Sequence, residues 1–219
     1  MRFLSLSRRA VSWSLSLLLL AACNHDISTP FPPGLEPLED NRAPVPAPVD
    51  GDDTPEAVET LGESRGDLTV GMARGFIHAP IADVAAALAD SAVAVDKTIA
   101  DEASITPATD PDYPTSFAVH YTVHSVITVE WDIDWREGAE HDREGHLQGY
   151  RARYQKTYGT DFITTFEGSV ELTPVSDTVT AYSMIERIDA HDQEVKDTVG
   201  DTVGLFSRLR DRVHGVTSH

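Results

Sequence analysis

The feature that most constrains the fold is a strict alternation of apolar with mainly polar side chains in the middle of the chain. The apolar positions are Phe117, Val119, Tyr121, Val123, Ile127, Val129, Trp131, Ile133 and Trp135. A period of two residues places every second side chain on the same face of a β-strand. The sequence therefore predicts strands here, each with one apolar face and one polar face.

Further strands are expected on both sides of this stretch. Their ranges are 68–78, 97–106, 150–154, 162–172 and 179–190. A helix over residues 81–89 is expected after the first of them, because apolar residues recur at helical spacing from Ile81 to Leu88 and Pro80 suits a first helical turn. Residues 91–100 are expected to add a second short helix.

The chain is expected to end in one long amphipathic helix. Its apolar face comprises Val195, Val199, Val203, Phe206, Leu209 and Val213. Asp192 is a suitable N-cap, and Gly215 is a suitable C-terminal stop. Strands that follow one helical excursion and precede a single helix predict an α+β fold with a mostly antiparallel sheet. About seven strands, curved around that helix, would leave a hollow between helix and sheet.

The beginning of the chain has the layout of a secretion signal. A basic stretch ends at Arg9, an apolar run follows, and two alanines precede Cys23. The apolar run is much shorter than the ~20 residues that a membrane-spanning helix needs. Residues 1–22 are therefore expected to be a cleaved signal peptide.

The segment Leu20–Cys23 resembles the lipobox of bacterial lipoproteins, in which the cysteine is acylated and the peptide bond before it is cut. This resemblance implies a lipidated Cys23, with palmitate-type chains that hold the protein in the cell envelope. Asn24 implies the periplasmic face of the outer membrane, with exposure at the cell surface as a further option. An ordinary signal peptide with a chance cysteine is the alternative.

Residues 23–65 have the composition of a tether. Eight of the 13 prolines lie between Asn24 and Arg65, among many acidic residues and without apolar periodicity. Such a chain buries too little surface to offset its ordering entropy. The sequence predicts a disordered spacer with a reach on the order of 100 Å, and it leaves residues 66–219 as the folded domain.

The formal charge of −19 narrows the possible partners. A nucleic-acid binder needs a basic surface to displace counterions, so nucleic acid is excluded as a partner. The same charge opposes binding to anionic lipid through the protein surface. A single cysteine excludes an intramolecular disulfide framework and any site of several cysteines. We expect a monomer without a cofactor.

The order of elements resembles that of START-like proteins, the SRPBCC or helix-grip group. The resemblance rests on Phe76–Val84, in which a strand leads through Ala-Pro into a helix that ends near Asp90, and on Tyr158–Thr160 and Glu171–Val175. It spans about residues 67–215. It implies a curved antiparallel sheet around the terminal helix and a cavity that holds a lipid or another apolar small molecule.

Large side chains on the expected inner faces are the candidates for lining such a cavity. They are Ile77, Ile127, Val129, Trp131, Ile133, Trp135, Tyr150, Tyr154, Phe162, Phe166, Met184, Val203 and Phe206. A filled structural core is the alternative interpretation of the same residues. No metal ligands and no catalytic residues are assigned. His120 and His124 would lie ~13 Å apart on a strand, and the loop from His141 to His146 shows no ordered ligand spacing.

Three function classes follow from these observations. The first is a lipid-anchored envelope protein whose START-like domain binds an apolar ligand. The second is a cyclase- or hydratase-like enzyme in the same cavity, which a buried acid such as Glu130 or Glu186 would favour. The third is a non-catalytic interaction module with a filled core and an exposed apolar patch.

Overall fold

The computed structural model describes residues 26–107, 110–125 and 127–216. Its elements in chain order are β1 (Asp26–Ser28), β2 (Val58–Arg65), β3 (Leu68–Ile77), α1 (Ile81–Ala89), α2 (Ser91–Ala94), β4 (Glu102–Pro107), β5 (Thr115–His124), β6 (Thr128–His141), β7 (Leu147–Thr160), β8 (Ile163–Ser176), β9 (Val179–Ala190) and α3 (Val195–Val213). The α+β class with an antiparallel sheet and a long terminal helix is confirmed.

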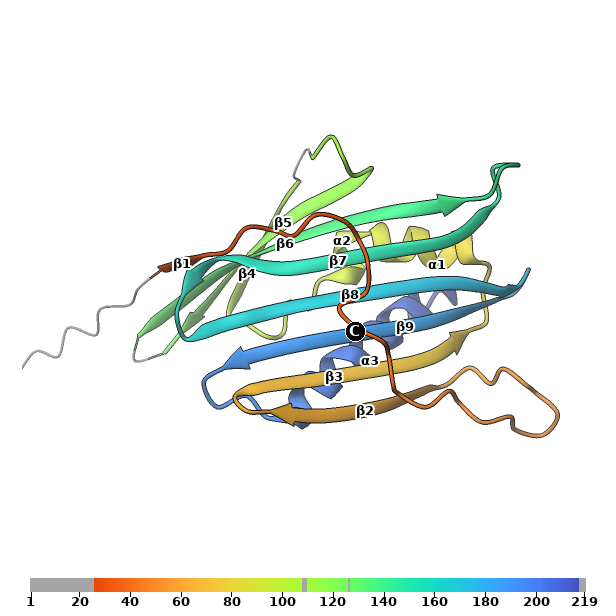
Figure 1. Cartoon of the computed structure of the whole chain (residues 1–219), viewed down its shortest axis with the longest axis horizontal. Helices are drawn as coiled ribbons and strands as arrows, with labels where there is room; N and C mark the ends of the chain where they lie inside the picture. Colours follow the sequence, from red (N-terminus) through yellow and green to blue (C-terminus); the bar gives the residue numbers. More distant parts are fainter. Residues whose placement is uncertain (1–25, 108–109, 126, 217–219) are drawn as a thin grey trace, which may run out of the picture.

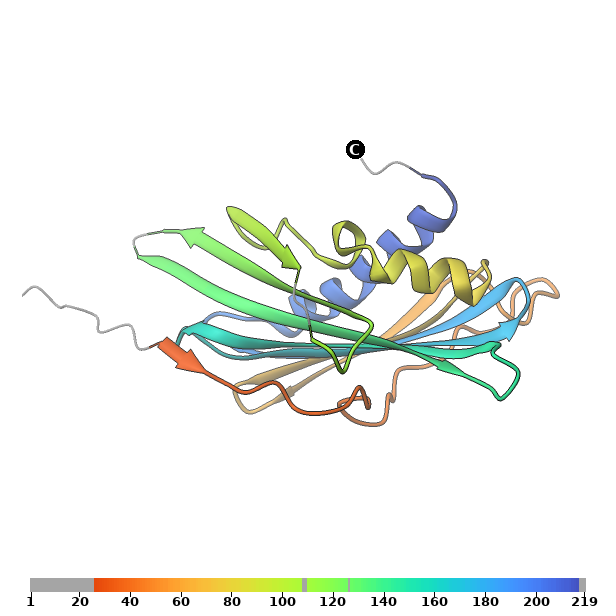
Figure 2. The same cartoon turned by 90° about the horizontal axis from the view of Figure 1, so that it is seen from above.

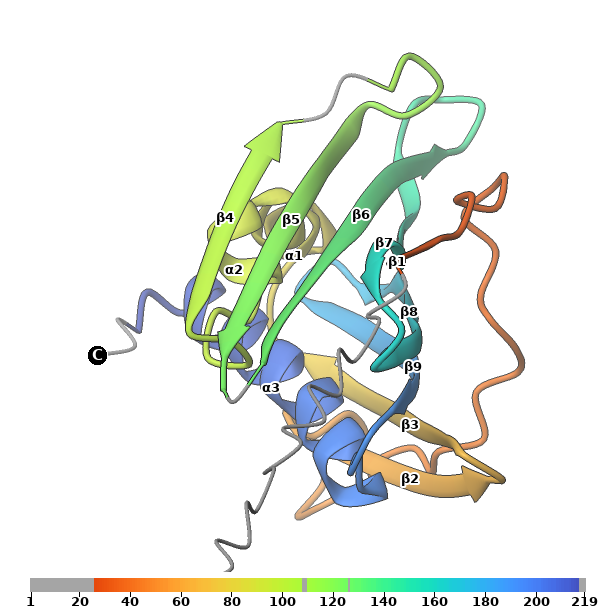
Figure 3. The ribbon, with the colours of Figure 1, turned by 90° about the vertical axis from the view of Figure 1, so that its left-hand side faces the viewer.

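The strands form one curved antiparallel sheet (Figures 1 and 3). Its order is β2-β3-β9-β8-β7-β6-β5-β4, and the short β1 pairs with the far end of β7. The described residues contain nine strands rather than about seven, because β1 and β2 lie in the segment expected to be disordered. The alternation between Phe117 and Trp135 forms β5 and β6, with Phe117 opposite Trp135 in the register.

All three helices lie on the concave face of the sheet (Figure 2). The helix α3 packs mainly on β3, where Gly71 allows the close approach. A Cβ atom at Gly71 would lie 2.6 Å from the Thr198 carbonyl oxygen. The buried stripe of α3 is rotated from the predicted one. It comprises Thr198, Thr202, Leu205, Phe206 and Leu209, whereas Val195, Val199, Val203 and Val213 are half-buried.

The end of α2 and the start of α3 differ from the sequence prediction. The helix α2 ends at Ala94, and the Asp90 side chain accepts a hydrogen bond from the Ala92 amide over 3.0 Å. Asp192 is not the N-cap of α3, because its φ of 61° places it in a left-handed turn before the helix. Gly215 follows the helix with a φ of +68°, as a C-terminal stop requires.

Residues 29–57, here called the strap, cross the convex face of the sheet (Figures 1 and 2). Asn41 fixes the strap by donating to the Ala73 carbonyl (2.9 Å), the Ser183 hydroxyl (3.0 Å) and the Met184 carbonyl (3.1 Å). A second small core lies beneath it. Its buried members are Ala43, Val70, Met72 and Ile185, with Leu38, Leu61 and Leu68 packed against them.

The prediction of a disordered tether over residues 23–65 is therefore wrong for residues 26–65. Prolines favour extended chain, and an extended chain can cross a sheet when a few side chains hold it there. Leu38 and Ala43 supply apolar contacts, and Glu39 pairs with Arg65 (2.9 Å) and Arg187 (3.6 Å).

The expected signal peptide and Cys23 lie outside the described residues. Among the residues that the structure describes, no helix is both long and apolar enough to cross a membrane.

Candidate functional site

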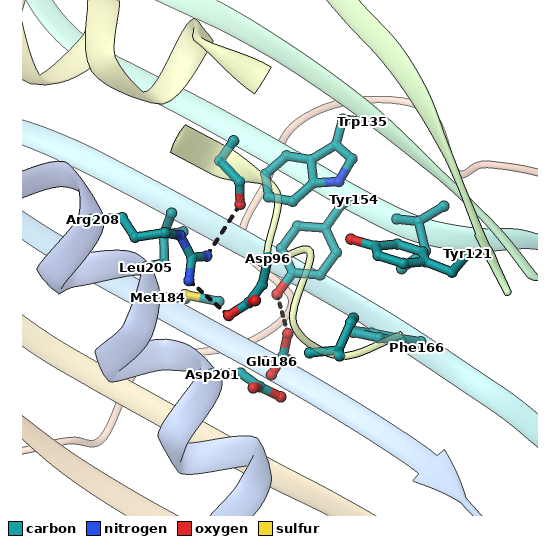
Figure 4. Close-up of a pocket in the computed structure, with 13 residues that line it drawn as sticks. Asp96, Tyr121, Trp135, Tyr154, Phe166, Met184, Glu186, Asp201, Leu205 and Arg208 are labelled. Atoms are coloured by element: carbon teal, nitrogen blue, oxygen red, sulfur yellow. Dashed lines mark hydrogen bonds and ion pairs between the residues drawn. The ribbon is translucent and has the colours of Figure 1, made fainter. Parts of the chain in front are cut away.

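A cavity of about 40 Å³ lies between α3 and the concave face of the sheet (Figure 4). Its walls come from the sheet, from α3 and from the loop between α2 and β4. The lining residues are Ala94, Asp96, Ile99, Tyr121, Ile133, Trp135, Tyr154, Phe166, Met184, Glu186, Asp201, Leu205 and Arg208. Apolar and aromatic groups form most of the wall, and the charged groups gather on the side of α3.

The aromatic part of the wall is a packed row of rings. Trp135 and Tyr154 are stacked with their centroids 4.3 Å apart, and Phe166 meets Tyr154 edge-on at 6.2 Å. Tyr154 also crosses the neighbouring strand at Gly168, its partner in the register. A Cβ atom at Gly168 would lie 2.0 Å from Tyr154 Cζ, so a residue without a side chain is needed at this position.

Two carboxyl groups meet at the base of the cavity. Glu186 is only 3% exposed, and its Oε1 accepts a hydrogen bond of 2.5 Å from the Tyr154 hydroxyl. No N–H or hydroxyl group of the described residues donates to its Oε2. Asp201 on α3 also lines the cavity, close enough to this carboxyl for each of the two groups to change the pKa of the other.

Burial sets the protonation of the pair. It raises the pKa of Glu186 well above its ordinary value, and the charge of Asp201 raises it further. Burial also raises the pKa of Asp201 to about 6. Near neutral pH the two groups therefore hold one proton and one negative charge between them.

The remaining charged groups of the cavity pair with each other. Arg208 donates to Asp96 Oδ2 (2.9 Å) and to the carbonyls of Val93 (2.8 Å) and Ala94 (3.3 Å). Burial raises the pKa of Asp96, but hydrogen bonds from Thr98 and the charge of Arg208 outweigh it and lower the pKa overall. Arg208 thus joins α3 to the loop that covers the cavity.

Known proteins resemble this chain in fold and not in sequence. No family model matches the chain, and no curated protein matches its sequence. Among solved structures, the STAR-related lipid transfer protein from Xanthomonas axonopodis matches with a TM-score of 0.51 at 16% identity, over 73% of this chain and 94% of that one. The chain has the START-like helix-grip fold.

Two further solved structures are similar over much of the chain. The lipid transfer and protein localization domain of human StarD13 matches with a TM-score of 0.49 at 9% identity, over 75% of this chain and 86% of that one. A START superfamily protein from Mycobacterium smegmatis matches with a TM-score of 0.46 at 15% identity, over 68% of this chain and 99% of that one.

The helix-grip cavity contains only some of the candidates from the sequence. Ile133, Trp135, Tyr154, Phe166 and Met184 line it. The other buried candidates belong to the surrounding core and not to the wall. They are Ile77, Trp131, Tyr150 and Phe206. Strand alternation specifies the inner face but not the depth, and the helices fill part of that face.

The remaining candidates lie away from the cavity. Val129 and Val203 are half-buried. Ile127 is 36% exposed at the turn between β5 and β6, and Phe162 lies at the turn between β7 and β8. None of these four residues lines the cavity. Ile127, Val129 and Phe162 lie at strand ends or turns, and Val203 lies on α3 outside its buried stripe.

Sequence reasoning missed most of the charged wall. Glu186 was a candidate buried acid, and it does line the helix-grip cavity, whereas Glu130 is exposed. Asp96, Asp201 and Arg208 carried no recognised motif. The position of Asp201 is the one available signal, because it places an acid directly before Thr202, at the border of the buried stripe of α3.

A second buried acid lies on the inner face outside this cavity. Glu137 on β6 has no exposed surface, and its Oε2 accepts a hydrogen bond of 2.7 Å from the Tyr150 hydroxyl. Burial raises the pKa of Glu137 to about 8. Its Oε1 has no hydrogen-bond partner among the described residues.

Several of the described histidines lie on the surface beside carboxylates. His120 contacts Asp132 at 2.7 Å across two strands, and His146 contacts Asp142 at 3.1 Å in the hairpin loop. Within residues 26–107, 110–125 and 127–216, no three His, Cys, Asp or Glu side chains are grouped so as to hold a metal ion.

Proposed function

We propose that this protein is a lipid-anchored component of a bacterial cell envelope whose helix-grip domain binds a lipid or another apolar small molecule in the cavity beside α3. The observation that carries the proposal is the wall itself. Trp135, Tyr154 and Phe166 form an apolar surface, and a few polar groups converge on one side of it. Ligand pockets generally combine these two features.

The fold gives further support to an apolar ligand. The matched structure from Xanthomonas axonopodis is described as a lipid transfer protein. A cavity of about 40 Å³ is smaller than the ~300–1,000 Å³ of a typical ligand pocket. Binding of a complete ligand therefore requires the loop of residues 95–101, which contributes Asp96 and Ile99, to move away from the sheet.

The anchor in this proposal is Cys23, which the lipobox resemblance assigns. Cys23 precedes β1 by three residues, so a direct connection spans about 10 Å at most. Because β1 is paired with β7, the domain would lie against the membrane at this end of the sheet and not on a long spacer. Acyl chains contribute ~0.8 kcal/mol per buried CH₂ group, which suits stable anchoring by two or more chains.

Calorimetric titration of the soluble Cys23→Ala chain with 1-octanol tests the ligand-binding part. We expect saturable binding that is weakened about tenfold or more by Ile99→Trp, which fills the cavity from the loop. Val175→Trp is the matched control, because Val175 is 49% exposed on β8. Equal binding by both variants, or no saturable binding at all, would overturn the proposal. In the native host, Cys23→Ala should also move the protein from the membrane fraction to the soluble fraction.

A second candidate is an acid–base enzyme of the cyclase or hydratase kind. Glu186 favours it, because a carboxyl that keeps its proton near neutral pH inside a cavity can donate that proton to a bound substrate. Mass spectrometry of a bound compound before and after incubation separates the two functions. A product formed by the wild-type chain and not by Glu186→Gln supports the enzyme, and unchanged compound in both supports a binding protein.

A further inference from the structure

The charges in the cavity do not balance. Glu186 and Asp201 together keep one negative charge near neutral pH, and Asp96 carries another. Arg208 is the single cationic side chain among the described residues that line the cavity. The cavity therefore holds about one net negative charge.

The hydrogen bonds of Arg208 go to α2 and the loop and not to the acid pair, although its charge lowers the pKa of Glu186 and of Asp201. All three of its guanidinium nitrogens already donate, one to Asp96 and two to the carbonyls of Val93 and Ala94. Charged groups are seldom buried without a partner, because burial removes their hydration. Glu186 Oε2 is such a case, because it is buried and no N–H or hydroxyl group of the described residues donates to it.

The aromatic rings beside the pair are suited to a cation. Tyr121, Trp135, Tyr154 and Phe166 all line the same cavity as Glu186 (Figure 4). The faces and hydroxyls of such rings attract ammonium groups, and the attraction increases when water is excluded. Because Trp135 is stacked between Phe117 and Tyr154, the rings available to a cation beside the carboxylates are those of Tyr121, Tyr154 and Phe166.

We propose that the cavity binds the ammonium head of an amine-bearing apolar ligand, with Glu186 and Asp201 as its counter-charge. This inference rests on the proposed function and names the class of its ligand. The volume of about 40 Å³ suits a small head group, whereas the apolar tail would occupy the space opened by the loop of residues 95–101. On binding, the carboxyl pair keeps its proton, and the single positive charge of the ammonium offsets the single negative charge of the pair.

The test compares three ligands with the same chain length, octylammonium, 1-octanol and octanoate, on the Cys23→Ala chain by isothermal calorimetry. We expect octylammonium to bind at least about tenfold more tightly than 1-octanol, and octanoate to bind most weakly. Repetition at about pH 5 and at about pH 7 should show that only octylammonium binds more weakly at the lower pH, because Asp201, with a pKa of about 6, is then protonated and the pair loses its negative charge. This second readout uses the unsubstituted cavity, so it does not depend on the folding of a variant.

Two substitutions locate the effect. Glu186→Gln and Asp201→Asn should each remove most of the preference for octylammonium over 1-octanol while leaving binding of 1-octanol in place. Asp197→Asn is the matched control, because Asp197 is an exposed acid one turn earlier on α3. Its preference should equal that of the wild-type chain.

The outcomes separate the inference from the function on which it rests. Equal affinity for all three ligands, tighter binding of octanoate, or a preference for octylammonium that is the same at about pH 5 as at about pH 7 would overturn the inference and leave apolar binding intact. Failure of all three ligands to bind would overturn the proposed function itself.

Discussion

The Tyr154 hydroxyl donates a hydrogen bond to Glu186 Oε1 across an intervening strand. The two residues belong to β7 and β9, and the register places Gly168 of β8 between them, opposite both. The Tyr154 ring crosses β8 through the space above Gly168. A row of three residues on neighbouring strands, Tyr154, Gly168 and Glu186, therefore sets the position of the buried acid.

Gly168→Ala should break this row. The new Cβ atom would lie 2.0 Å from Tyr154 Cζ, so the ring must leave Glu186 or the strands must separate. We expect a loss of about 1–3 kcal/mol in the free energy of unfolding, measured with urea. Gly200→Ala is the control at an exposed position of α3, where a new Cβ atom meets nothing within 4 Å and should stabilise the helix. Equal stability of Gly168→Ala and the wild-type chain would contradict the account.

Glu137→Gln should flatten the pH dependence of stability. The pKa of Glu137 is about 8 in the folded chain, against an ordinary value of 4.5, so the folded state retains a proton that the unfolded state loses. The bound proton stabilises the folded state fully below about pH 4.5. This stabilisation, several kcal/mol in total, is lost as the pH rises towards about 8.

Urea unfolding at about pH 5 and at about pH 8 checks this prediction. Relative to the wild-type chain, Glu137→Gln should gain stability at the higher pH, because glutamine can still accept the Tyr150 hydrogen bond without ionising. Glu130→Gln removes an acid from the exposed part of the same strand and should leave the slope unchanged. The same slope in all three chains would show that Glu137 ionises freely.

Asn41→Ala should loosen the strap. It removes three hydrogen bonds to β3 and β9, which predicts a loss of about 1–3 kcal/mol in the free energy of unfolding. Limited proteolysis should then cut within residues 29–57 before it cuts the sheet. Asp53→Ala, at an exposed position of the strap, should behave as the wild-type chain. If Asn41→Ala is cut no faster than the control, the strap is held by other contacts.

Arg208→Met should release the loop that covers the cavity. The substitution removes the hydrogen bonds to Val93, Ala94 and Asp96. Because the side chains of Arg208 and Asp96 are partly exposed, we expect the free energy of unfolding to fall by only about 1–3 kcal/mol. Hydrogen exchange should increase in residues 95–101. The control is Arg212→Met, which breaks a more exposed ion pair with Asp90 and should lower the free energy of unfolding by no more than about 1 kcal/mol. Unchanged exchange in Arg208→Met would contradict this role.

Local patterns in the sequence predicted the elements that depend on local spacing. The strand over residues 179–190 and the helix over residues 81–89 agree with β9 and α1, because their periodicity lies within one element. The strap was missed because the partners of Asn41 are 32 to 143 residues away. Composition indicated a chain that buries too little surface to be ordered, and it could not indicate that the sheet would supply hydrogen bonds and apolar contacts to the strap.

The candidate site was predicted in part for the same reason. Alternation placed Trp135 and Tyr154 on the inner face, and both line the cavity. The partnership of Glu186 with Asp201 depends on where α3 crosses the sheet, which no spacing within the sequence specifies. The close approach at Gly71 sets that crossing, but a glycine within a strand can equally mark a bulge or a bend.

The central claim is that an apolar molecule enters the cavity beside α3. Titration of the ¹⁵N-labelled Cys23→Ala chain with 1-octanol, followed through the two indole N–H signals of Trp131 and Trp135, tests it most directly. Trp135 lines the cavity and Trp131 does not, although both are buried on β6. The account predicts a saturable shift that is clearly larger for Trp135. No saturable shift, or an equal shift of both signals, would contradict it.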